Sequence, residues 1–273
     1  MKKTITSWLL NLTSIAISLF VAVPSLLILV NSFKNQEEAA DLSLSLPSRW
    51  QIWENYSKVF QEGKLALAFG NTALVTLASV AGILLFCAMA AYVIQRRSNA
   101  FTRLLRSALL MGMVLPISII TTYMFMDKLG LTGNFAGIIL LHIATNFAFI
   151  TYLYIGFFAG IPRELDEAAN LDGVEGFKLF NKIIFPLLMP INATALILSF
   201  MTIWNDFSLS LYFLNSPSRF TLTLTILSFF GQHTSDWNLV FADVIMISLP
   251  VILVYIFLQK YIVAGMTSGA VKS

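Results

Sequence analysis

Long apolar runs separated by shorter polar segments dominate the sequence. Six of them approach or exceed the roughly 20 residues that a helix needs to cross a bilayer: Trp8–Val30, Leu65–Ile94, Ser107–Met126, Ala136–Phe158, Leu187–Ile203 and Leu239–Leu258. The first run follows two lysines, as a secretory signal does, but it is longer than the roughly 7–15 apolar residues of such a signal and lacks a clean cleavage site. We therefore predict six uncleaved transmembrane helices.

The amino-acid composition shows which class of protein this pattern belongs to. Of the 273 residues, 58% are hydrophobic and 11% are charged, whereas an ordinary soluble domain is about 25% charged. So few charges could not cover the surface of a globule of this size. Soluble enzymes, nucleic-acid-binding domains, coiled coils and disordered chains are excluded as descriptions of the whole chain, and the predicted fold class is an all-α polytopic membrane protein.

Charge placement predicts the orientation of the chain. Because successive loops alternate sides, 11 lysines and arginines fall on one side and 6 on the other, together the 17 of the sequence. The richer side, which includes the cluster from Arg96 to Arg106, is expected to be cytoplasmic, with both termini. The expected divisions are an N-terminal end and first helix at 1–30, an extracytoplasmic loop at 31–64, a five-helix core at 67–259 and a cytoplasmic tail at 260–273.

The segment 161–186, between the fourth and fifth runs, reads as helix, turn and helix. Pro162 suits a helix start, acidic residues follow near the positive helix end, and Gly173 suits a helix stop. Acids outnumber bases five to three in this segment. Two interpretations compete, an amphipathic hairpin on the lipid surface and a knob that inserts into a partner protein. The partner is favoured, because anionic cytoplasmic lipids would repel the acids.

The spacing within this segment resembles the EAA loop of binding-protein-dependent ABC importer permeases. The matching positions are Glu167-Ala168-Ala169, Gly173, Ile183 and Pro186, with Phe185 where the family has leucine. The extension to Asp172-Gly173 is similar to the carbohydrate-import branch, which includes the smaller maltose permease. Further likenesses lie at Asn71-Thr72, Ala91-Tyr92, Gly156-Phe157-Phe158, Trp204-Asn205-Asp206-Phe207 and the C-terminal segment Gln259–Lys272.

This resemblance implies the type I ABC importer transmembrane fold, in a bacterial or archaeal cytoplasmic membrane. It also implies the partners: a second homologous permease subunit, two cytosolic ATPase subunits that bind ATP-Mg, an extracytoplasmic solute-binding protein, a sugar and membrane lipid, but no nucleic acid. In the family the EAA loop docks into a cleft of the ATPase, which carries docking roles over to Glu167, Ala168, Ala169, Asp172, Gly173, Ile183 and Pro186. The tail contacts implied are Gly265, Gly269 and Lys272.

The chain itself offers little catalytic chemistry. It has no Gly-rich Walker loop for ATP and only two histidines, too few for a metal cluster. We expect neither enzyme activity nor a bound cofactor. Polar groups in spans are costly unless they serve a purpose, so the candidate substrate pathway comprises Asn146, Asn192, Trp204, Asn205 and Asp206. The alternative for each residue is that it bonds helices together or lies at the membrane interface.

Two other functions remain open at this point. A permease for an amino acid, a phosphonate or glycerol phosphate shares the short EAA pattern, although the Asp172-Gly173 extension disfavours it. A membrane scaffold or channel would need no such loop. The sequence therefore favours the permease subunit of an ATP-driven importer for a sugar or oligosaccharide.

Overall fold

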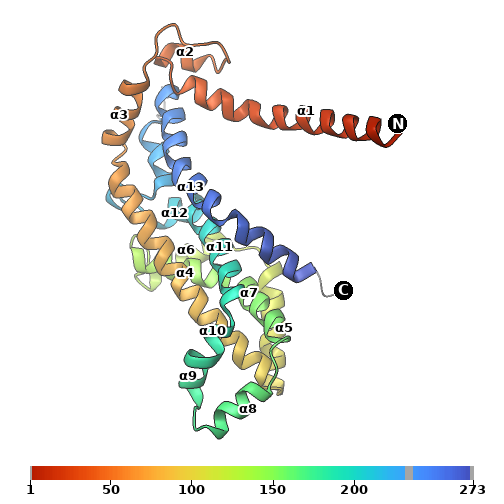
Figure 1. Cartoon of the computed structure of the whole chain (residues 1–273). Coiled ribbons are helices and arrows are strands. Elements are labelled where there is room, and N and C mark those ends of the chain that lie inside the picture. The colour runs from red at the N-terminus through yellow and green to blue at the C-terminus, as the bar shows by residue number, and fades with distance from the viewer. Residues whose placement is uncertain (1, 231–235, 271–273) are drawn as a thin grey trace. The chain divides into compact units, whose positions relative to one another are not determined.

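The computed structural model describes residues 2–230 and 236–270, and the side-chain surroundings of residues 10–15, 17–230 and 236–256. Within these residues the chain is helical and contains no strand, which confirms the all-α expectation. The elements are α1 (Lys2–Asn31), α2 (Gln36–Ala40), α3 (Ile52–Glu62), α4 (Leu65–Arg96), α5 (Ala100–Val114), α6 (Ile119–Lys128), α7 (Phe135–Phe158), α8 (Glu164–Leu171), α9 (Gly176–Leu179), a π-helix (Phe180–Ile184), α10 (Phe185–Leu187), α11 (Met189–Trp204), α12 (Ser208–Phe213), 3-10 helices (Pro217–Arg219 and Leu222–Ser228) and α13 (Trp237–Ala270) (Figure 1).

Four helical segments are long and apolar enough to cross a membrane, namely Leu10–Asn31, Leu65–Arg96, Phe135–Phe158 and Trp237–Ile256. Two further candidates are bent pairs. Helices α5 and α6 meet at 120°, and the segment Gly176–Leu187 meets α11 at 80°. Counted as one span each, they complete the six predicted spans. The sequence therefore located the apolar segments, but two of them are not straight helices.

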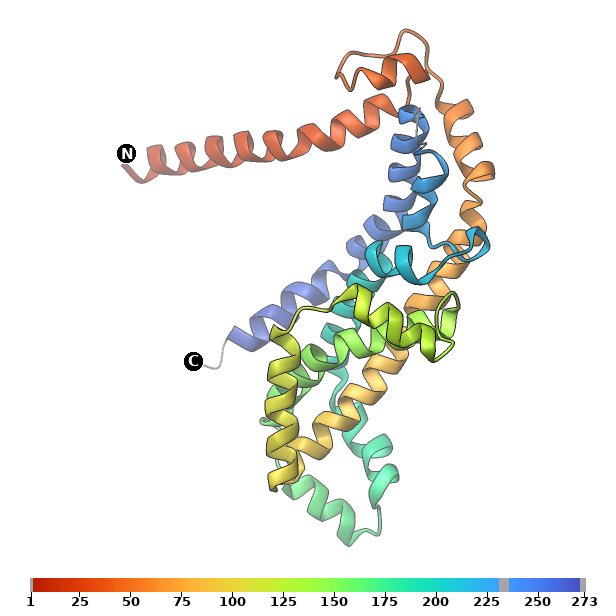
Figure 2. The same cartoon turned by 180° about the vertical axis from the view of Figure 1, so that it is seen from behind.

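The third apolar run, Ser107–Met126, is not one continuous helix as its composition suggests. Helix α5 ends at Val114 and α6 begins only at Ile119 (Figure 2). Pro116 explains the break, because proline has no N–H to donate and keeps the preceding residue out of the helical region. Leu115 accordingly has an extended backbone, with φ −73° and ψ 124°.

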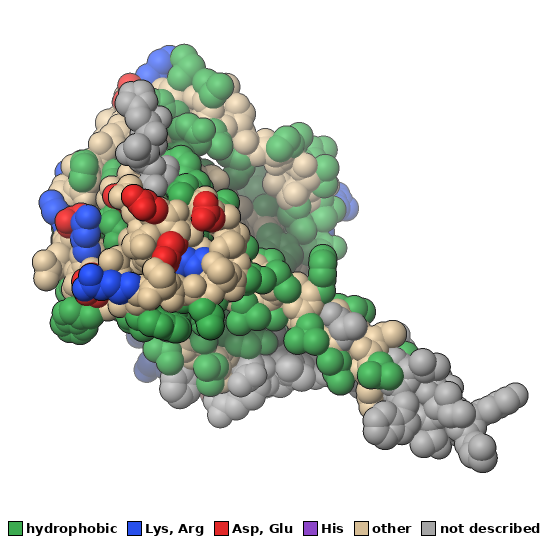
Figure 3. All heavy atoms as spheres, turned by 90° about the horizontal axis from the view of Figure 1, so that it is seen from above, with side chains coloured by type: hydrophobic (Ala, Val, Ile, Leu, Met, Phe, Trp, Pro, Cys, Tyr) green, Lys and Arg blue, Asp and Glu red, His purple; other side chains and the backbone are tan. Residues whose placement is uncertain are grey.

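The chain divides into two compact units. The first comprises Met1–Phe69 with Leu222–Pro250, and the second comprises Gly70–Thr221 with Val251–Ser273. In the first unit the described side chains of α1 are mostly exposed and apolar, as expected of a helix in lipid. Figure 3 shows hydrophobic side chains along α1, whereas acidic and basic side chains gather over α2 and α3.

Lys34 ties the polar loop of the first unit to the end of α1. Its side chain is fully buried. The ammonium Nζ donates to Asn31 Oδ1 at 3.0 Å, to the Ser43 carbonyl at 2.8 Å, and to the hydroxyls of Ser43 and Ser45 at 3.1 and 3.2 Å. A buried ammonium is stable only when such oxygens replace its water. Lys34 therefore shapes the loop rather than serving as a free positive charge.

Replacing Lys34 with methionine, of similar length, should destabilise the first unit. The oxygens around Nζ would lose their donor inside the protein, and an unsatisfied buried polar group costs about 1–3 kcal/mol. We expect a lower Tm for K34M in detergent and an unchanged Tm for the control K58M, because Lys58 is exposed on α3. Equal Tm values for the two variants would contradict this role of Lys34.

A second polar network holds α3 in the first unit. Asn55 of α3 donates from Nδ2 to the carbonyls of Ser32 and Lys34, both at 2.9 Å, and its Oδ1 accepts from Asn238 Nδ2 at 2.9 Å. Elsewhere in this unit the Thr225 hydroxyl bonds both carboxylate oxygens of buried Asp243, at 3.1 and 2.9 Å. Asp243, one of the polar groups inside a predicted span, thus bonds a 3-10 helix to α13.

Helix α7 lies at the centre of the second unit. It packs against α5, α11 and α12, and α12 in turn packs against α6. The buried side of α7 includes Ile138, Leu141, Ile150, Tyr154 and Phe158. Helices α8 and α9 form a hairpin beyond the ends of α4 and α7 (Figures 1 and 2). This arrangement leaves the segment 161–186 at one end of the second unit.

Candidate functional site: the EAA loop and the broken spans

Helix α8 carries the first half of the EAA loop. It begins at Glu164, two residues later than Pro162, so the predicted proline at the first helical position lies just outside the helix. Three acidic residues occupy the first turn, Glu164, Asp166 and Glu167. They lie where the partial positive charge of the helix end stabilises negative side chains.

Gly173 ends α8 as predicted, and the hydrogen bonds explain why glycine is needed. Its φ is +72°, a left-handed conformation that residues with a Cβ rarely adopt. Gly173 N donates to Asn170 O at 3.1 Å, and Val174 N donates to Ala169 O at 2.9 Å. This is the Schellman pattern, which satisfies the last carbonyls of a helix. A Cβ on Gly173 would meet no atom within 4 Å, so the requirement is conformational rather than steric.

The second half of the EAA loop is held by aromatic packing. The buried ring of Phe180 lies 5.8 Å from Tyr92, 6.4 Å from Phe177 and 5.9 Å from Phe185, measured between centroids. Aromatic pairs at these separations add about 0.5–1.5 kcal/mol each beyond their buried area. Phe185, which replaces the family's leucine, is therefore part of this cluster.

The surface of the EAA loop mixes acidic and apolar groups. Of the predicted docking residues, Ala169 is buried, Ile183 is half-buried, and the remaining ones are exposed: Glu167, Ala168, Asp172, Gly173 and Pro186. Two larger apolar side chains accompany them, Leu171 at 90% exposure and Phe177 at 62%. Ala169 thus packs inside the loop, whereas Leu171 and Phe177 add contact area that was not among the predicted docking residues.

Three of the candidate pathway residues lie where the fifth span ends. Trp204 is buried, and its ring stacks on Phe200 at 5.0 Å. Asn205 is exposed and donates to Met201 O at 2.8 Å, within its own helix. The Asp206 carboxylate accepts from the backbone N–H groups of Leu209 at 3.1 Å and Ser210 at 2.8 Å. Asp206 thereby caps the first turn of α12.

His142, one of the two histidines that are too few for a metal cluster, faces this capped turn. Its Nε2 lies 3.9 Å from Asp206 Oδ2, and its side chain is 3% exposed. Asn146, one turn further along α7, donates to the His142 carbonyl at 2.9 Å. Asn146 thus contacts the backbone of His142, and Asp206 lies near its imidazole. The chemistry of a buried imidazole next to a carboxylate could have drawn attention to His142, but their proximity arises only in the fold.

Asn192 lies apart from that group. Its Oδ1 accepts from the hydroxyl of buried Tyr154 at 2.6 Å, which joins α11 to α7. Two of the larger cavities in the second unit lie among its helices. One, of about 780 Å³ between α6 and α12, contains Ser118, Tyr123 and Tyr212.

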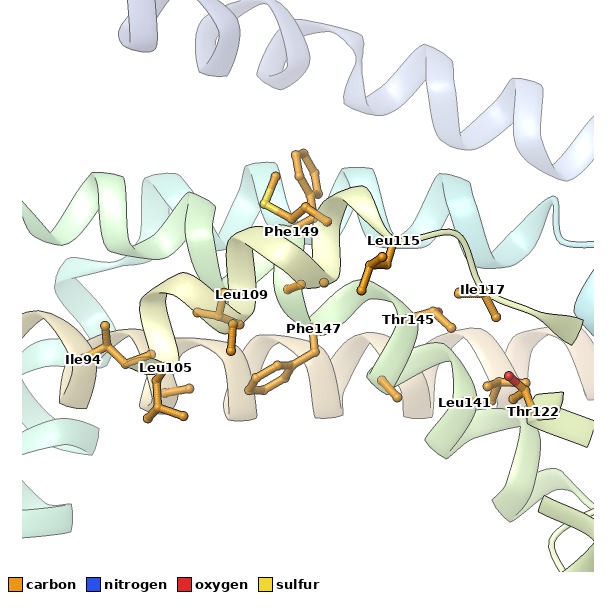
Figure 4. A pocket seen from close by; sticks show the side chains of 16 residues that line it. Ile94, Leu105, Leu109, Leu115, Ile117, Thr122, Leu141, Thr145, Phe147 and Phe149 are labelled. Carbon is orange, nitrogen blue, oxygen red and sulfur yellow. The ribbon is translucent and has the colours of Figure 1, made fainter. Parts of the chain in front are cut away.

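The other cavity, of about 960 Å³, runs along α4, α5 and α7, with Ile94 and Leu105 near one end and Ile117 and Thr122 near the other (Figure 4). Its walls are almost entirely apolar.

The predicted tail contacts lie at the limit of the described residues or beyond it. Gly265 and Gly269 lie in the backbone of α13, in a part whose side-chain surroundings are not described, and Lys272 lies outside the described residues. Among the residues that the structure does describe, no three His, Cys, Asp or Glu side chains are grouped so as to hold a metal ion.

Comparison with known proteins now identifies the family. The profile of the binding-protein-dependent transport system inner membrane component matches residues 82–268. This chain belongs to that family. The match covers the EAA loop and the spans on either side of it. This inner membrane component is a multi-pass membrane protein and a transport permease rather than an enzyme, and permeases of this kind work with ATPase and solute-binding partners.

Its relatives match over most of their length. The probable starch degradation products transport system permease AmyC of Thermoanaerobacterium thermosulfurigenes is 33% identical over 99% of both chains. The melibiose/raffinose/stachyose import permease MelC of Bacillus subtilis (strain 168) is 35% identical over 81% of both. A crystal structure of a bacterial ABC transporter involved in the import of the acidic polysaccharide alginate contains a chain with the same fold, at TM-score 0.78 and 24% identity, with 93% of this chain and 95% of that chain covered.

Proposed function

We propose that this permease forms half of the membrane pathway of an ATP-driven importer for a sugar or oligosaccharide. The proposal rests on the substrates that are stated in the names of its relatives. AmyC, MelC and the multiple sugar-binding transport permease MsmG of Streptococcus mutans (34% identical over 93% of both chains) are all permeases for sugars or their polymers. An amino acid, phosphonate or glycerol phosphate is not favoured.

The proposed assembly has five polypeptides. A second, homologous permease encloses the pathway with this chain, two ATPase subunits bind ATP-Mg on the cytosolic side, and a solute-binding protein delivers the sugar from outside. Both termini lie in the cytoplasm, as the excess of lysine and arginine on that side supports. The absence of a Walker loop from the sequence supports ATP binding by the partners rather than by this chain.

The EAA loop is the proposed docking element for the ATPase. It lies beyond the ends of α4 and α7, and it combines exposed Leu171 and Phe177 with exposed Glu167 and Asp172. Exposed apolar patches rimmed by polar residues mark protein interaction sites, and Leu171 and Phe177 supply the large apolar side chains for such a patch. Contacts of Gly265, Gly269 and Lys272 with the ATPase remain part of the proposal by resemblance alone.

Leu171 offers a direct test of docking. Because its side chain is 90% exposed, L171E should leave the stability and membrane insertion of the chain unchanged. A charge buried in an apolar cleft without a partner is strongly unfavourable, so we expect L171E to lose the ATPase on co-purification and to lose uptake. L171M is the matched control and should retain both. Normal ATPase recovery with L171E would place the docking surface elsewhere.

In the proposed mechanism, closure of the ATPase dimer displaces the EAA loop and shifts the spans from an inward-open to an outward-open state. Such a shift requires contacts that differ between the two states. The breaks at Leu115–Ser118 and Asn205–Phe207 support a pathway next to them, since non-helical backbone at membrane depth is tolerated where it is buried in protein or lines a cavity. Asn146, Asn192, Trp204, Asn205 and Asp206 are the candidate residues.

The substrate class is tested by reconstituting the permease with its partners in proteoliposomes. Uptake of labelled oligosaccharides is compared with uptake of glutamine, a phosphonate and glycerol phosphate, each with and without ATP inside. The proposal expects ATP-dependent accumulation of a saccharide alone. Accumulation of one of the other solutes in its place would contradict it.

A further inference from the structure

Arg96, the last residue of α4, holds the beginning of the EAA loop. Its Nε forms a close ion pair with Asp166 Oδ2 at 2.5 Å. The two other guanidinium nitrogens donate to the carbonyls of Ile161 and Pro162, at 3.1 and 3.2 Å. The side chains of Arg96 and Asp166 are only 11% and 14% exposed. A single planar guanidinium therefore binds the lead-in to α8 and its first turn together, which the point charge of a lysine could not do.

A second arginine, which belongs to the loop, bonds back to α4. Arg163 donates from Nη2 to the carbonyl of Gln95 at 3.2 Å, at the C-terminal end of α4, where a positive charge is favourable. The pair of Arg163 with Glu167 that helical spacing suggests is not formed. In the described part of the chain, every side-chain hydrogen bond or ion pair that joins residues 159–172 to a spanning helix ends on Gln95 or Arg96.

The other half of the EAA loop contacts α4 one turn earlier. The ring of Tyr92 lies 5.8 Å from Phe180 and 5.9 Å from Phe158 at the end of α7. Residues four apart lie on one face of a helix, so Tyr92 and Arg96 present a common face of α4. Both helical parts of the loop are therefore attached to the same end of the same span.

The EAA loop is also joined covalently to α7 and to α11, but neither connection is a continuous α-helix. Towards α11 the chain passes through a π-helix and an 80° bend. Towards α7 it leaves the helix through a turn after Phe158. Helix α4, in contrast, is continuous over 32 residues, about 48 Å at 1.5 Å per residue. A displacement of α8 thus has a straight, bonded path into the second span.

We propose that Arg96 and Asp166 are a positioning pair that transmits the displacement of the EAA loop to α4. This inference rests on the proposed function, since it takes the ATPase to be docked on the loop. Arg96 does not touch the ATPase or the sugar in this assignment. Arg96 couples the movement of the ATPase to the spans, so its loss should lower the amount of sugar transported per ATP hydrolysed without preventing assembly.

The test measures the ratio of sugar transported to ATP hydrolysed, in proteoliposomes containing the complete transporter with its partner permease, ATPase and solute-binding protein. The variants are R96Q, D166N, the charge exchange R96D/D166R and the control R97Q, which alters an exposed neighbouring arginine. We expect R96Q and D166N to lower the ratio about tenfold, a typical size for coupling between sites, while the ATPase co-purifies and still hydrolyses ATP. R97Q should leave the ratio unchanged.

The charge-exchange variant R96D/D166R distinguishes loss of the ion pair from general disruption of the loop. Because it restores opposite charges but not the bonds to the Ile161 and Pro162 carbonyls, we expect partial recovery of the ratio. No recovery would overturn the assignment to the ion pair, and so would a normal ratio in both single variants. Loss of the ATPase from R96Q would make the pair a docking support and overturn the coupling role. Failure of the unaltered chain to bind an ATPase would instead refute the proposed function.

Discussion

Most sugar transport is expected to be lost when Gly173 is replaced by valine, although the chain still inserts into the membrane. Gly173 has a φ of +72°, a conformation that costs an L-residue about 1–2 kcal/mol and is least accessible to β-branched side chains. Valine would move the backbone out of this region and release the two hydrogen bonds that end α8. Leu171, Asp172 and the second half of the EAA loop would then lose their positions relative to α8.

Because every 1.4 kcal/mol changes an equilibrium tenfold, we expect G173V to reduce ATPase co-purification and sugar uptake by about tenfold or more. The control is G173N, since asparagine tolerates the left-handed conformation and the site has open space for its Cβ. G173N should retain most of the uptake. Equal uptake by G173V and the unaltered chain would refute the role of this turn.

Replacing Asp206 with alanine is expected to have the second largest effect. The Asp206 carboxylate caps α12 through Leu209 and Ser210, and loss of such a cap costs about 0.5–2 kcal/mol. The same substitution removes the charge that faces His142 at 3.9 Å. We expect D206A to lower both the Tm and the uptake, with the ATPase still bound.

Two comparisons separate the cap from a contribution to the pathway. Asparagine caps helices about as well as aspartate, but its amide has one acceptor oxygen where the Asp206 carboxylate uses two. D206N should therefore restore the Tm in part, while its uptake should remain low if the carboxylate serves the pathway. N205A is the neighbouring comparison. Among the described residues, the Asn205 side chain bonds only within its own helix end, and we expect reduced uptake at an unchanged Tm. Full uptake by both D206N and N205A would return Asp206 to a purely structural role.

The sequence correctly predicted those features that are determined by residues close together along the chain. The apolar runs located the spans because crossing a bilayer requires a length of apolar chain, whatever the packing around it. Gly173 marked the end of α8 because a left-handed turn demands a particular residue at a particular place. Pro116 was also visible, but its effect was missed because the apolar run continues through it.

Pairings between distant segments were not predictable in the same way. Nothing local to Tyr154 indicates Asn192 as its partner, and nothing near Lys34 indicates that its ammonium is buried among serine oxygens. The 120° angle between α5 and α6 is likewise more than an effect of Pro116. Helix α6 packs against α12, with Tyr123 and Phe213 in ring contact at 5.6 Å.

The sequence by itself determined that this chain crosses the membrane repeatedly, and it located the EAA loop, because hydropathy and turn chemistry act over a few neighbouring residues. Only the tertiary structure decided how that loop is held. The sequence placed Arg96 only in the basic cluster expected on the cytoplasmic side, whereas in the fold it binds Asp166 and two carbonyls of the loop. Such a bond exists only after folding brings distant residues within a few ångströms, and the spacing of residues along the chain does not encode that proximity.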